Sequence, residues 1–360
     1  MRGAVLMGLD QPLEVRDDLE VIGPGPGQVH VKIAASGVCH SDLSLQNGTL
    51  PHPMPVVPGH EAAGVVLNVG DGVTHVKEGD HVIIAFWPPC WNCRACLGGQ
   101  SHLCETYTEA AIGVPRMKTA DTPLFSYAGV GSFAEEVMVL GEAAVPIPDD
   151  VPLDIAALIG CGVMTGVGAA LNTAKVQPGS SVVVFGCGGV GISVIQGARI
   201  AGATEIIAVD LVESKLDEAK KFGATHAVAP GGLGAVNMEL TGGRGFDYAF
   251  EVVGRPETIR SAWDATRRGG TTVVVGAGRM DAMVAFSAFE LFYQERTLKG
   301  CWYGSANVRL DFPRLLGFWR QGTLDLEGMI SRRIDLSEIN DAFAALERGE
   351  FVRQVIDFSA

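Results

Sequence analysis

Four of the eight cysteines in this 360-residue chain are crowded into one short segment. Thiolates so close along the chain can surround one Zn²⁺ tetrahedrally, and four sulfur ligands leave no position for a substrate. Two disulfides or an iron–sulfur cluster would use the same residue type. A reducing compartment disfavours disulfides, and the sequence suggests no redox partner for a cluster. The spacing therefore predicts a structural zinc site at Cys90, Cys93, Cys96 and Cys104.

Three further residues with metal-binding side chains are spread along the chain. Cys39 lies in Gly-Val-Cys-His-Ser-Asp, His60 in Gly-His-Glu and Cys161 in Gly-Cys-Gly. Two thiolates and one imidazole leave the fourth zinc position open, which is the pattern of a catalytic site. Spacing alone does not bring distant residues together, and a lone buried cysteine is usually a small apolar residue. On residue types alone, a metal site and ordinary packing both stay open.

A glycine-rich segment of the pattern G-x-G-x-x-G follows the apolar run 181–185 and precedes a helix-like segment that reaches Ala201. Gly186 permits a tight turn, Gly188 lets the backbone approach a pyrophosphate, and Gly191 allows close packing of helix on strand. The free N–H groups at the start of the helix attract phosphate. The segment predicts a dinucleotide site made by Gly186, Gly188, Gly189, Val190 and Gly191.

Asp210 ends the next strand-like run, 205–210. Its carboxylate can accept hydrogen bonds from both hydroxyls of an adenosine ribose and would repel a 2′-phosphate, which favours NAD over NADP. The alternative is an ordinary strand-to-helix turn capped by an aspartate.

The elements that position these residues differ between the two parts of the chain. The first 150 residues carry short strand-like runs, such as 29–33, 64–67 and 81–84, and their prolines predict that helices are absent. From Leu153 onward, strands alternate with helices, which predicts a parallel sheet. The expected strands are 181–185, 205–210, 226–228, 246–252, 271–276 and 297–302. The final segment, helix-like at 336–349 and strand-like at 351–358, does not extend this alternation and is a candidate to return to the first part.

Composition excludes several classes of protein. With 27 basic against 41 acidic residues, the formal net charge of −14 argues against nucleic acid or anionic membrane as the main partner. A hydrophobic fraction of 47% excludes intrinsic disorder. The N-terminus lacks a secretory pattern. The uncharged stretch 155–174 is long enough to span a membrane, but its glycines and polar residues favour a buried core segment. We expect a soluble, cytoplasmic protein of two domains.

Together and in this order, the motifs closely resemble those of the zinc-dependent medium-chain alcohol dehydrogenases, and the resemblance covers essentially the whole chain. It implies an α/β protein with a GroES-like β-rich catalytic domain, residues 1–162 and 303–360, and a Rossmann NAD-binding domain with a doubly wound parallel sheet, residues 163–302. It also implies a homodimer or homotetramer, NAD, and two zinc ions per subunit. The activity implied is reversible hydride transfer between a primary or secondary alcohol and NAD, which gives an aldehyde or ketone.

The resemblance also implies roles at the metal. Cys39, His60 and Cys161 match the ligands of the catalytic zinc. Glu61 matches a residue that coordinates the metal transiently, and Asp42 matches the carboxylate that holds the histidine ligand in the right tautomer.

Other positions match contacts with the proton, the cofactor and the substrate. Ser41 matches the hydroxyl that takes the alcohol's proton, although the histidine that often passes that proton on is Ser44 here. Cys187 and Cys301 match no ligand and are expected to be packing thiols. The cofactor contacts implied are His40, Thr165, Val190, Lys215 and Arg353. The substrate-pocket positions implied are Phe86, Trp87 and Tyr127, with core packing as the alternative.

Three competing functions remain. A thiol-dependent formaldehyde dehydrogenase of the same family would need formaldehyde and a low-molecular-weight thiol together. Some relatives hold their cofactor tightly and need an artificial acceptor. A non-catalytic NAD-binding scaffold protein would have no need for Cys39, His60, Cys161 and Ser41, and all four are present.

Overall fold

The computed structural model describes residues 1–107 and 112–359, and these form two compact units. The first unit comprises Met1–Gly162, Asn307–Trp319 and Leu326–Ala360, and the second comprises Val163–Ala306 and Arg320–Asp325. The first unit is therefore built from both ends of the chain. The second begins beyond Gly162 and ends at Ala306 rather than at residue 302, and it also takes in a short later segment. The domain boundaries inferred from the sequence stay a proposal.

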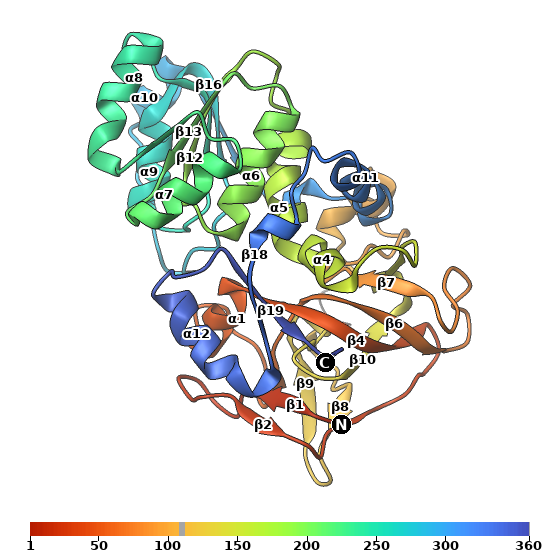
Figure 1. Ribbon diagram of the computed structural model, residues 1–360. Coiled ribbons are helices and arrows are strands. Elements are labelled where there is room, and N and C mark those ends of the chain that lie inside the picture. The colour runs from red at the N-terminus through yellow and green to blue at the C-terminus, as the bar shows by residue number, and fades with distance from the viewer. Residues whose placement is uncertain (108–111, 360) are drawn as a thin grey trace. The chain divides into compact units, whose positions relative to one another are not determined.

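A seven-stranded sheet forms the centre of the first unit (Figure 1). Strand β19 pairs antiparallel with β4, with Gln354 opposite Val38, so the C-terminal segment completes the sheet begun near the N-terminus. Apolar side chains such as Val31, Ile33 and Val137 are fully or almost fully buried against this sheet. In spatial order the strands are β11 (Ala144–Pro146), β7 (His81–Ile84), β6 (Glu61–Val69), β4 (Gln28–Val38), β19 (Arg353–Asp357) and β18 (Ile330–Ile334), with β10 (Glu136–Leu140) paired to β4.

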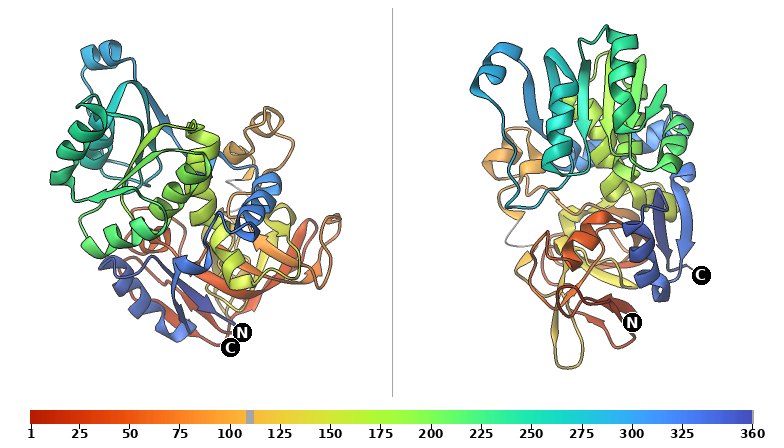
Figure 2. Two further views of the ribbon diagram at one scale, coloured as in Figure 1. Left: turned by 45° about the horizontal axis from the view of Figure 1, so that its top comes forward. Right: turned by 90° about the vertical axis from the view of Figure 1, so that its left-hand side faces the viewer.

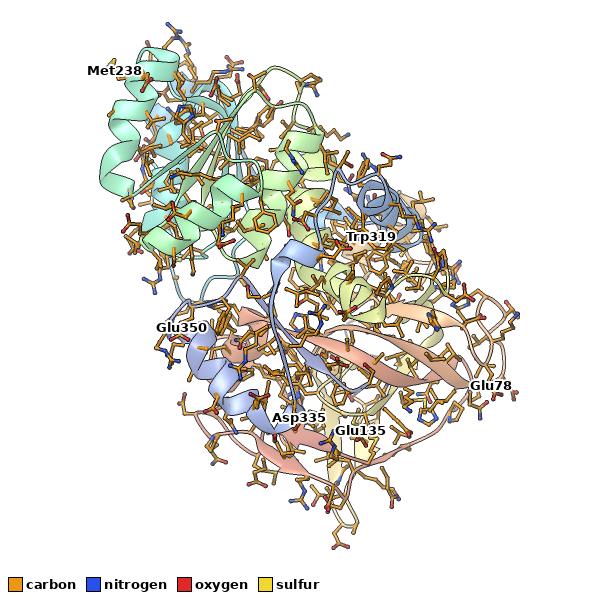
Figure 3. The ribbon with its side chains drawn as sticks, in the orientation of Figure 1. Glu78, Glu135, Met238, Trp319, Asp335 and Glu350 are labelled. Atoms are coloured by element: carbon orange, nitrogen blue, oxygen red, sulfur yellow. The ribbon has the colours of Figure 1, made fainter. Side chains whose placement is uncertain are left out.

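Smaller elements complete the first unit. Arg2 forms ion pairs with both Glu135 and Asp335, which joins the N-terminal segment to the C-terminal one. Figure 3 labels the two acidic side chains. The short strands are β1 (Gly3–Val5), β2 (Glu14–Arg16), β3 (Glu20–Val21), β5 (Val56–Val57), β8 (Met117–Lys118) and β9 (Pro123–Ser126). The helices include α1 (His40–Gln46), α2 (Arg94–Leu97), α4 (Leu153–Leu158), α11 (Val308–Arg320) and α12 (Ile339–Glu347).

The prediction that helices are absent from the first 150 residues is wrong at α1 and α2. Helix α1 forms because Cys39 and Asp42 cap its first turn: the Cys39 N–H donates to Asp42 Oδ2 at 3.1 Å. The helix spans only His40–Gln46, so it leaves little periodicity in the sequence.

The second unit is a six-stranded parallel sheet in the order β14-β13-β12-β15-β16-β17, with helices on both of its faces (Figures 1 and 2). Its central strand β12 is buried along nearly its whole length, as expected for a strand covered on both faces. The strands are β12 (Ser181–Phe185), β13 (Glu205–Val209), β14 (His226–Val228), β15 (Phe246–Glu251), β16 (Thr266–Val274) and β17 (Thr297–Gly300). The helices are α5 (Met164–Gly168), α6 (Gly189–Ile200), α7 (Glu213–Lys221), α8 (Leu233–Thr241), α9 (Pro256–Ala265) and α10 (Ala288–Gln294).

The helical segment Leu153–Ala174 is long and apolar enough by composition to cross a membrane. Of its most apolar window, 83% is buried inside the protein. Burial of this kind is typical of a core helix, as the glycines and polar residues of the segment predicted.

Candidate active site

The register of two strands brings Cys39 and His60 together. Gly37 of β4 lies opposite Glu61 of β6, so the residues just beyond this pair, Cys39 after β4 and His60 before β6, are neighbours. Both are buried, with 5% and 2% of their surface exposed.

Helix α4 and the turn that follows it supply Cys161. The helix packs against β4 and β6, and a Cβ at Gly160 would lie 3.0 Å from the Ile84 carbonyl oxygen and 3.3 Å from the Ala62 nitrogen. This close approach places Cys161 beside the other two residues. The ligand atoms of Cys39, His60 and Cys161 all lie within 4.8 Å of one another.

The donor set of this trio fits zinc. A tetrahedral ion bonds to sulfur at about 2.3 Å and to imidazole nitrogen at about 2.0 Å, so ligand atoms separated by less than 4.8 Å can share one ion after small adjustments. His60 Nε2 is buried and has no hydrogen-bond partner among the described residues. A buried nitrogen without a partner costs free energy, and a cation bound at this position would remove that cost.

Asp42 holds the trio in place. Its fully buried carboxylate accepts hydrogen bonds from the Cys39 N–H at 3.1 Å, the Gly59 N–H at 2.9 Å and His60 Nδ1 at 3.1 Å. Because an ionised carboxylate only accepts, His60 Nδ1 carries the proton. In the neutral ring the lone pair is then on Nε2, which is the nitrogen available to a metal.

Charge around the trio favours a cation. Burial lowers the pKa of His60, but attraction to Asp42 outweighs it, so the net pKa lies well above the ordinary value. A hydrogen bond between the two thiols lowers the pKa of Cys39 and raises that of Cys161. Cys39 is therefore the more readily ionised of the two thiols.

Glu61 lies behind the trio and faces a buried arginine. Glu61 Oε1 accepts the Gly162 N–H at 2.7 Å and lies 3.6 Å from Arg353 Nη2. Burial raises the pKa of Glu61 to about 7, although Arg353 opposes the shift. A Cβ at Gly162 would come within 1.8 Å of Arg353 Nη2, which explains why a glycine follows Cys161. The pairing of Arg353 with Glu61 was missed by the sequence analysis, and no spacing signal could have found it.

Ser41 and two aromatic rings border the trio. Ser41 Oγ lies 3.9 Å from Cys39 Sγ, and the Tyr127 hydroxyl donates to the Ser41 carbonyl at 3.2 Å. The rings of Phe86 and Tyr127 stand edge-on to His60, with centroids at 5.5 Å and 5.4 Å. His52 contacts Tyr127 at 5.6 Å and was not singled out from the sequence.

Trp87 contacts a different cluster. Its ring lies 5.4 Å from that of Tyr107 and packs with the four-cysteine lobe. Phe86 and Tyr127 thus border His60, whereas Trp87 contacts the lobe.

The second sulfur cluster is the one predicted from spacing. The sulfurs of the four cysteines lie within 4.8 Å of one another, and Cys90 Sγ is 4.0 Å from Cys96 Sγ, far beyond disulfide length. Tetrahedral Zn–S bonds of about 2.3 Å place sulfurs roughly 3.8 Å apart. A hydrogen bond between Cys90 and Thr106, together with backbone N–H groups that donate to the sulfur, lowers the pKa of Cys90 to about 6, as suits a thiolate ligand. The cluster consists of Cys90, Cys93, Cys96 and Cys104.

The glycine-rich turn of the second unit has the three features expected of it. Gly186 has a φ of 100°, a conformation that favours glycine. A Cβ at Gly191 would lie 1.9 Å from the Gly186 carbonyl oxygen, whereas a Cβ at Gly188 would meet nothing within 4 Å. Gly186 and Gly191 are therefore required by the turn itself, and Gly188 borders open space in front of helix α6.

Asp210 completes this turn. It follows β13, and its carboxylate accepts the Cys187 N–H at 2.8 Å and the Val212 N–H at 3.0 Å. Cys187 is fully buried, and burial raises the pKa of its thiol to about 12, which agrees with a packing thiol.

The five other residues that were predicted to contact the cofactor lie in both units. Thr165, Val190 and Lys215 are partly exposed in the second unit. In the first unit, His40 is exposed at the start of α1, whereas Arg353 has only 4% of its surface exposed. The roles of these five residues stay predictions.

Two family models match the chain. Residues 25–149 match the alcohol dehydrogenase GroES-like domain, and residues 189–320 match the zinc-binding dehydrogenase domain. Together they cover most of both units.

Proteins of similar length match over almost the whole chain. A putative alcohol dehydrogenase D of Mycobacterium tuberculosis is 40% identical over 98% of each chain. An S-(hydroxymethyl)glutathione dehydrogenase of Paracoccus denitrificans is 37% identical over 99% of each chain. An NDMA-dependent alcohol dehydrogenase of Amycolatopsis methanolica is 38% identical over 100% of this chain and 99% of its own. The crystal structure of benzyl alcohol dehydrogenase from Acinetobacter calcoaceticus superimposes with a TM-score of 0.93 and 30% identity over 99% of each chain.

Two glycine substitutions in the glycine-rich turn distinguish an effect on NADH binding from an effect on the stability of the fold. Gly188→Ala should leave the melting temperature unchanged, because its Cβ meets no protein atom, but should weaken NADH binding about tenfold or more, because the backbone can no longer approach the pyrophosphate closely. Gly191→Ala should destabilise the protein by about 1–3 kcal/mol, because its Cβ collides with Gly186. Fluorescence titration with NADH and thermal unfolding measure both. Unchanged NADH affinity in Gly188→Ala would remove this residue from the cofactor site.

Proposed function

Because the chain belongs to the zinc-dependent medium-chain alcohol dehydrogenases, we propose that Cys39, His60 and Cys161 hold its catalytic zinc and that the turn at residues 186–191 holds its NAD. The protein is an NAD-dependent zinc alcohol dehydrogenase, which transfers a hydride between an alcohol and NAD. The observation that carries the assignment of the ligands is the buried, unpartnered Nε2 of His60 within 4.8 Å of two cysteine sulfurs.

The chain's residues have distinct tasks in this reaction. When bound, zinc acts as a Lewis acid that makes an alcohol hydroxyl more acidic, and NAD accepts the hydride. Ser41 Oγ, 3.9 Å from Cys39 Sγ, takes the proton from the substrate hydroxyl. Tyr127 fixes the backbone at Ser41, and Asp42 holds a proton on His60 Nδ1, so that Nε2 is the ring nitrogen available to the metal. The edge-on rings of Phe86 and Tyr127 provide an apolar wall beside His60 that suits the carbon chain of an alcohol.

At the cofactor, Asp210 selects the ribose. Its carboxylate is anchored by two backbone N–H groups and presents negative charge beside the glycine-rich turn. A ribose with two free hydroxyls can donate to it, whereas a 2′-phosphate would be repelled. Thr165 and Val190 are assigned to the nicotinamide, Lys215 to a ribose, and His40 and Arg353 to the pyrophosphate. Glu61 is assigned transient coordination of the metal.

A second, structural zinc is assigned to the four-cysteine lobe, which gives two zinc ions per subunit. The support is the closed donor set of four sulfurs and the N–H groups that donate to Cys90 Sγ at 3.3 Å and 3.5 Å. Thiolate sites of this kind persist in a reducing compartment, which supports a cytoplasmic location.

The first unit corresponds to the catalytic domain of this proposal and the second to the NAD-binding domain. A homodimer is proposed to form through β17, the edge strand of the parallel sheet. All four residues of β17 are exposed, and on the adjacent helix α10 the side chains of Phe289 and Phe292 are 69% and 79% exposed. An exposed sheet edge is a template for pairing with a second strand, and a two-fold axis would set β17 against its own copy.

Replacement of a central residue of this edge should abolish dimerisation. Leu298→Lys places a charge in β17, where 41% of the leucine is exposed, and should convert the protein to a monomer in multi-angle light scattering. Met238→Lys on α8, which is 64% exposed, is the control and should leave a mass of two chains. A wild-type monomer, or a dimer in Leu298→Lys, would contradict this interface.

Removal of one sulfur from each cluster should affect turnover in one case and thermal stability in the other. Cys161→Ala should reduce zinc from two ions per chain to one and lower turnover by at least about 1,000-fold, with the fold retained. Cys93→Ala should also lose one zinc, but it should reduce thermal stability more than it changes turnover per folded molecule. Metal analysis by mass spectrometry, circular dichroism and NADH absorbance measure these effects. Full activity in Cys161→Ala would refute the assignment of the catalytic zinc.

The thiol-dependent formaldehyde dehydrogenase activity is the second candidate, because relatives 37% identical carry that kind of name. A screen of alcohols and aldehydes by NADH absorbance, with and without an added thiol, separates the two. We expect simple alcohols to be oxidised without thiol. Activity confined to formaldehyde plus thiol would favour the second candidate, and NAD(H) that stays bound through purification would indicate a need for an artificial acceptor.

A further inference from the structure

A cavity of about 570 Å³ lies in the second unit at the amino-terminal ends of its parallel strands. Ser181 begins β12, Asp247 lies near the start of β15, and Arg296 directly precedes β17. The glycine-rich turn follows the opposite, carboxyl end of β12, and five residues of strand span about 13 Å. The cavity is therefore separate from the proposed NAD site.

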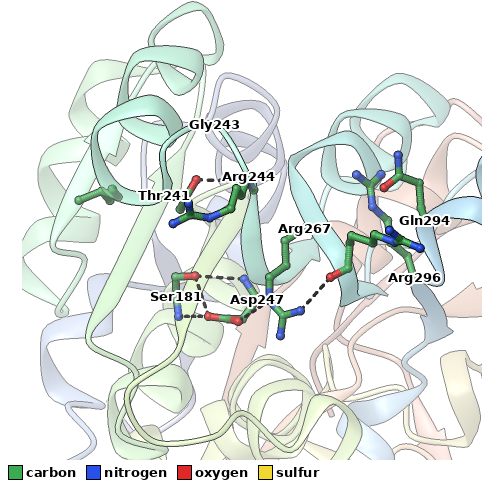
Figure 4. Close-up of a pocket in the computed structure, with 11 residues that line it drawn as sticks. Ser181, Thr241, Gly243, Arg244, Asp247, Arg267, Gln294 and Arg296 are labelled. Atoms are coloured by element: carbon green, nitrogen blue, oxygen red, sulfur yellow. Dashed lines mark hydrogen bonds and ion pairs between the residues drawn. The ribbon is translucent and has the colours of Figure 1, made fainter.

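The walls of this cavity are strongly basic in an acidic protein. Four arginines line it, Arg244, Arg267, Arg268 and Arg296, and Asp247 is the one acidic residue among its lining residues. The whole chain carries a net charge of −14, so this concentration of guanidinium groups is a local departure from its surroundings. Figure 4 shows Arg244 on one side of the Asp247–Arg267 pair and Arg296 on the other.

The carboxylate of Asp247 already accepts hydrogen bonds from neighbouring residues. Its carboxylate accepts the Ser181 N–H at 2.8 Å, the Ser181 hydroxyl at 2.9 Å and Arg267 Nε at 2.6 Å. These bonds outweigh the effect of burial, so the net pKa of Asp247 lies below its ordinary value. Arg267 is thereby neutralised, and three guanidinium groups have no carboxylate partner within the cavity.

Those three groups keep most of their hydrogen-bond donors available. Across residues 1–107 and 112–359, the guanidinium groups of Arg244 and Arg268 make no hydrogen bond or ion pair. Arg268 is instead held over the ring of Tyr293 at 4.7 Å, which leaves the edge of its guanidinium open. Arg296 donates once, to the Trp263 carbonyl at 2.6 Å, and its buried Nε has no partner among the described atoms.

We infer that this cavity binds a small anion that carries two or more linked phosphate groups. Guanidinium groups form paired hydrogen bonds with phosphate oxygens, and a phosphate directs its oxygens tetrahedrally, so arginines from separate elements can bond to it together. A cavity of about 570 Å³ is larger than one phosphate needs and lies in the range of small-molecule sites. Three unpaired guanidinium groups also match a ligand with several negative charges.

Binding would connect three separate segments of the second unit. Arg244 belongs to the loop after α8, Arg268 to β16, and Arg296 to the short connection between α10 and β17. An anion shared by these three residues ties the three segments together, and a ligand that binds only the folded protein raises its stability. This inference does not depend on the proposed dehydrogenase function, because none of these residues is assigned to catalysis or to NAD.

The test is calorimetric titration of the full-length, purified protein with inorganic tripolyphosphate, at constant ionic strength and with NAD present in excess. We expect saturable binding of one anion per chain and a rise in melting temperature, whereas acetate at the same ionic strength should give neither. Adenosine triphosphate is titrated in parallel. Tighter binding of the nucleotide would identify a nucleotide as the occupant, and equal binding would identify the polyphosphate group alone; both results support the site.

Two matched pairs of substitutions test the location. Arg244→Gln with Arg268→Gln should weaken tripolyphosphate binding about tenfold or more. Lys220→Gln with Lys221→Gln removes the same charge from exposed positions on α7 and should leave the affinity within about twofold. If the double arginine variant does not fold, Arg244→Gln alone serves, because it removes no hydrogen bond or ion pair within the described chain. Dehydrogenase activity should be unchanged in these variants.

Three results would overturn the inference. The first is the absence of saturable tripolyphosphate binding, and the second is an equal loss of affinity in the arginine and lysine variants. The third is displacement of the anion by NAD, which would place the anion at the glycine-rich turn. If the proposed dehydrogenase function were wrong, the protein would form no NADH but would still bind the anion.

Discussion

The carboxylate of Asp42 is the contact on which the metal site depends. It is fully buried, it caps the helix that begins after Cys39, and it accepts hydrogen bonds from the backbone of Gly59 and from His60. One negative group therefore positions a sulfur ligand and a nitrogen ligand from separate segments. It also fixes the histidine tautomer, so that Nε2 carries the free lone pair. A buried carboxylate with three donors is stable, and its loss would leave those donors without partners.

Close approach of backbone is the second constraint. Gly160 and Gly162 flank Cys161. A Cβ at Gly162 would collide with Arg353, and a Cβ at Gly160 would be in tight contact with Ile84 and strand β6. The same rule operates in the second unit, where Gly191 packs against Gly186. The glycines in these motifs therefore allow close backbone packing, and the residues between them carry the functional side chains.

Much of this could be predicted from the sequence, because its strongest signals are local. The spacing of the four cysteines, the glycine-rich turn and the apolar runs of the parallel strands each act over a few residues, and the structure places them as expected. Helix α1 was missed because a helix of only seven residues leaves little periodic pattern. The convergence of Cys39, His60 and Cys161, and the burial of Arg353 against Glu61, depend on strand register and helix packing, which spacing does not encode. There the family resemblance supplied what the residues alone left open.

The most direct test of the account is anomalous diffraction at the zinc absorption edge from crystals of the purified protein. We expect an ion about 2.3 Å from Cys39 Sγ and Cys161 Sγ and about 2.0 Å from His60 Nε2, with its fourth position facing a solvent molecule or substrate. This expectation would be contradicted if those three atoms surrounded no anomalous peak, or if a fourth cysteine or histidine permanently completed the coordination.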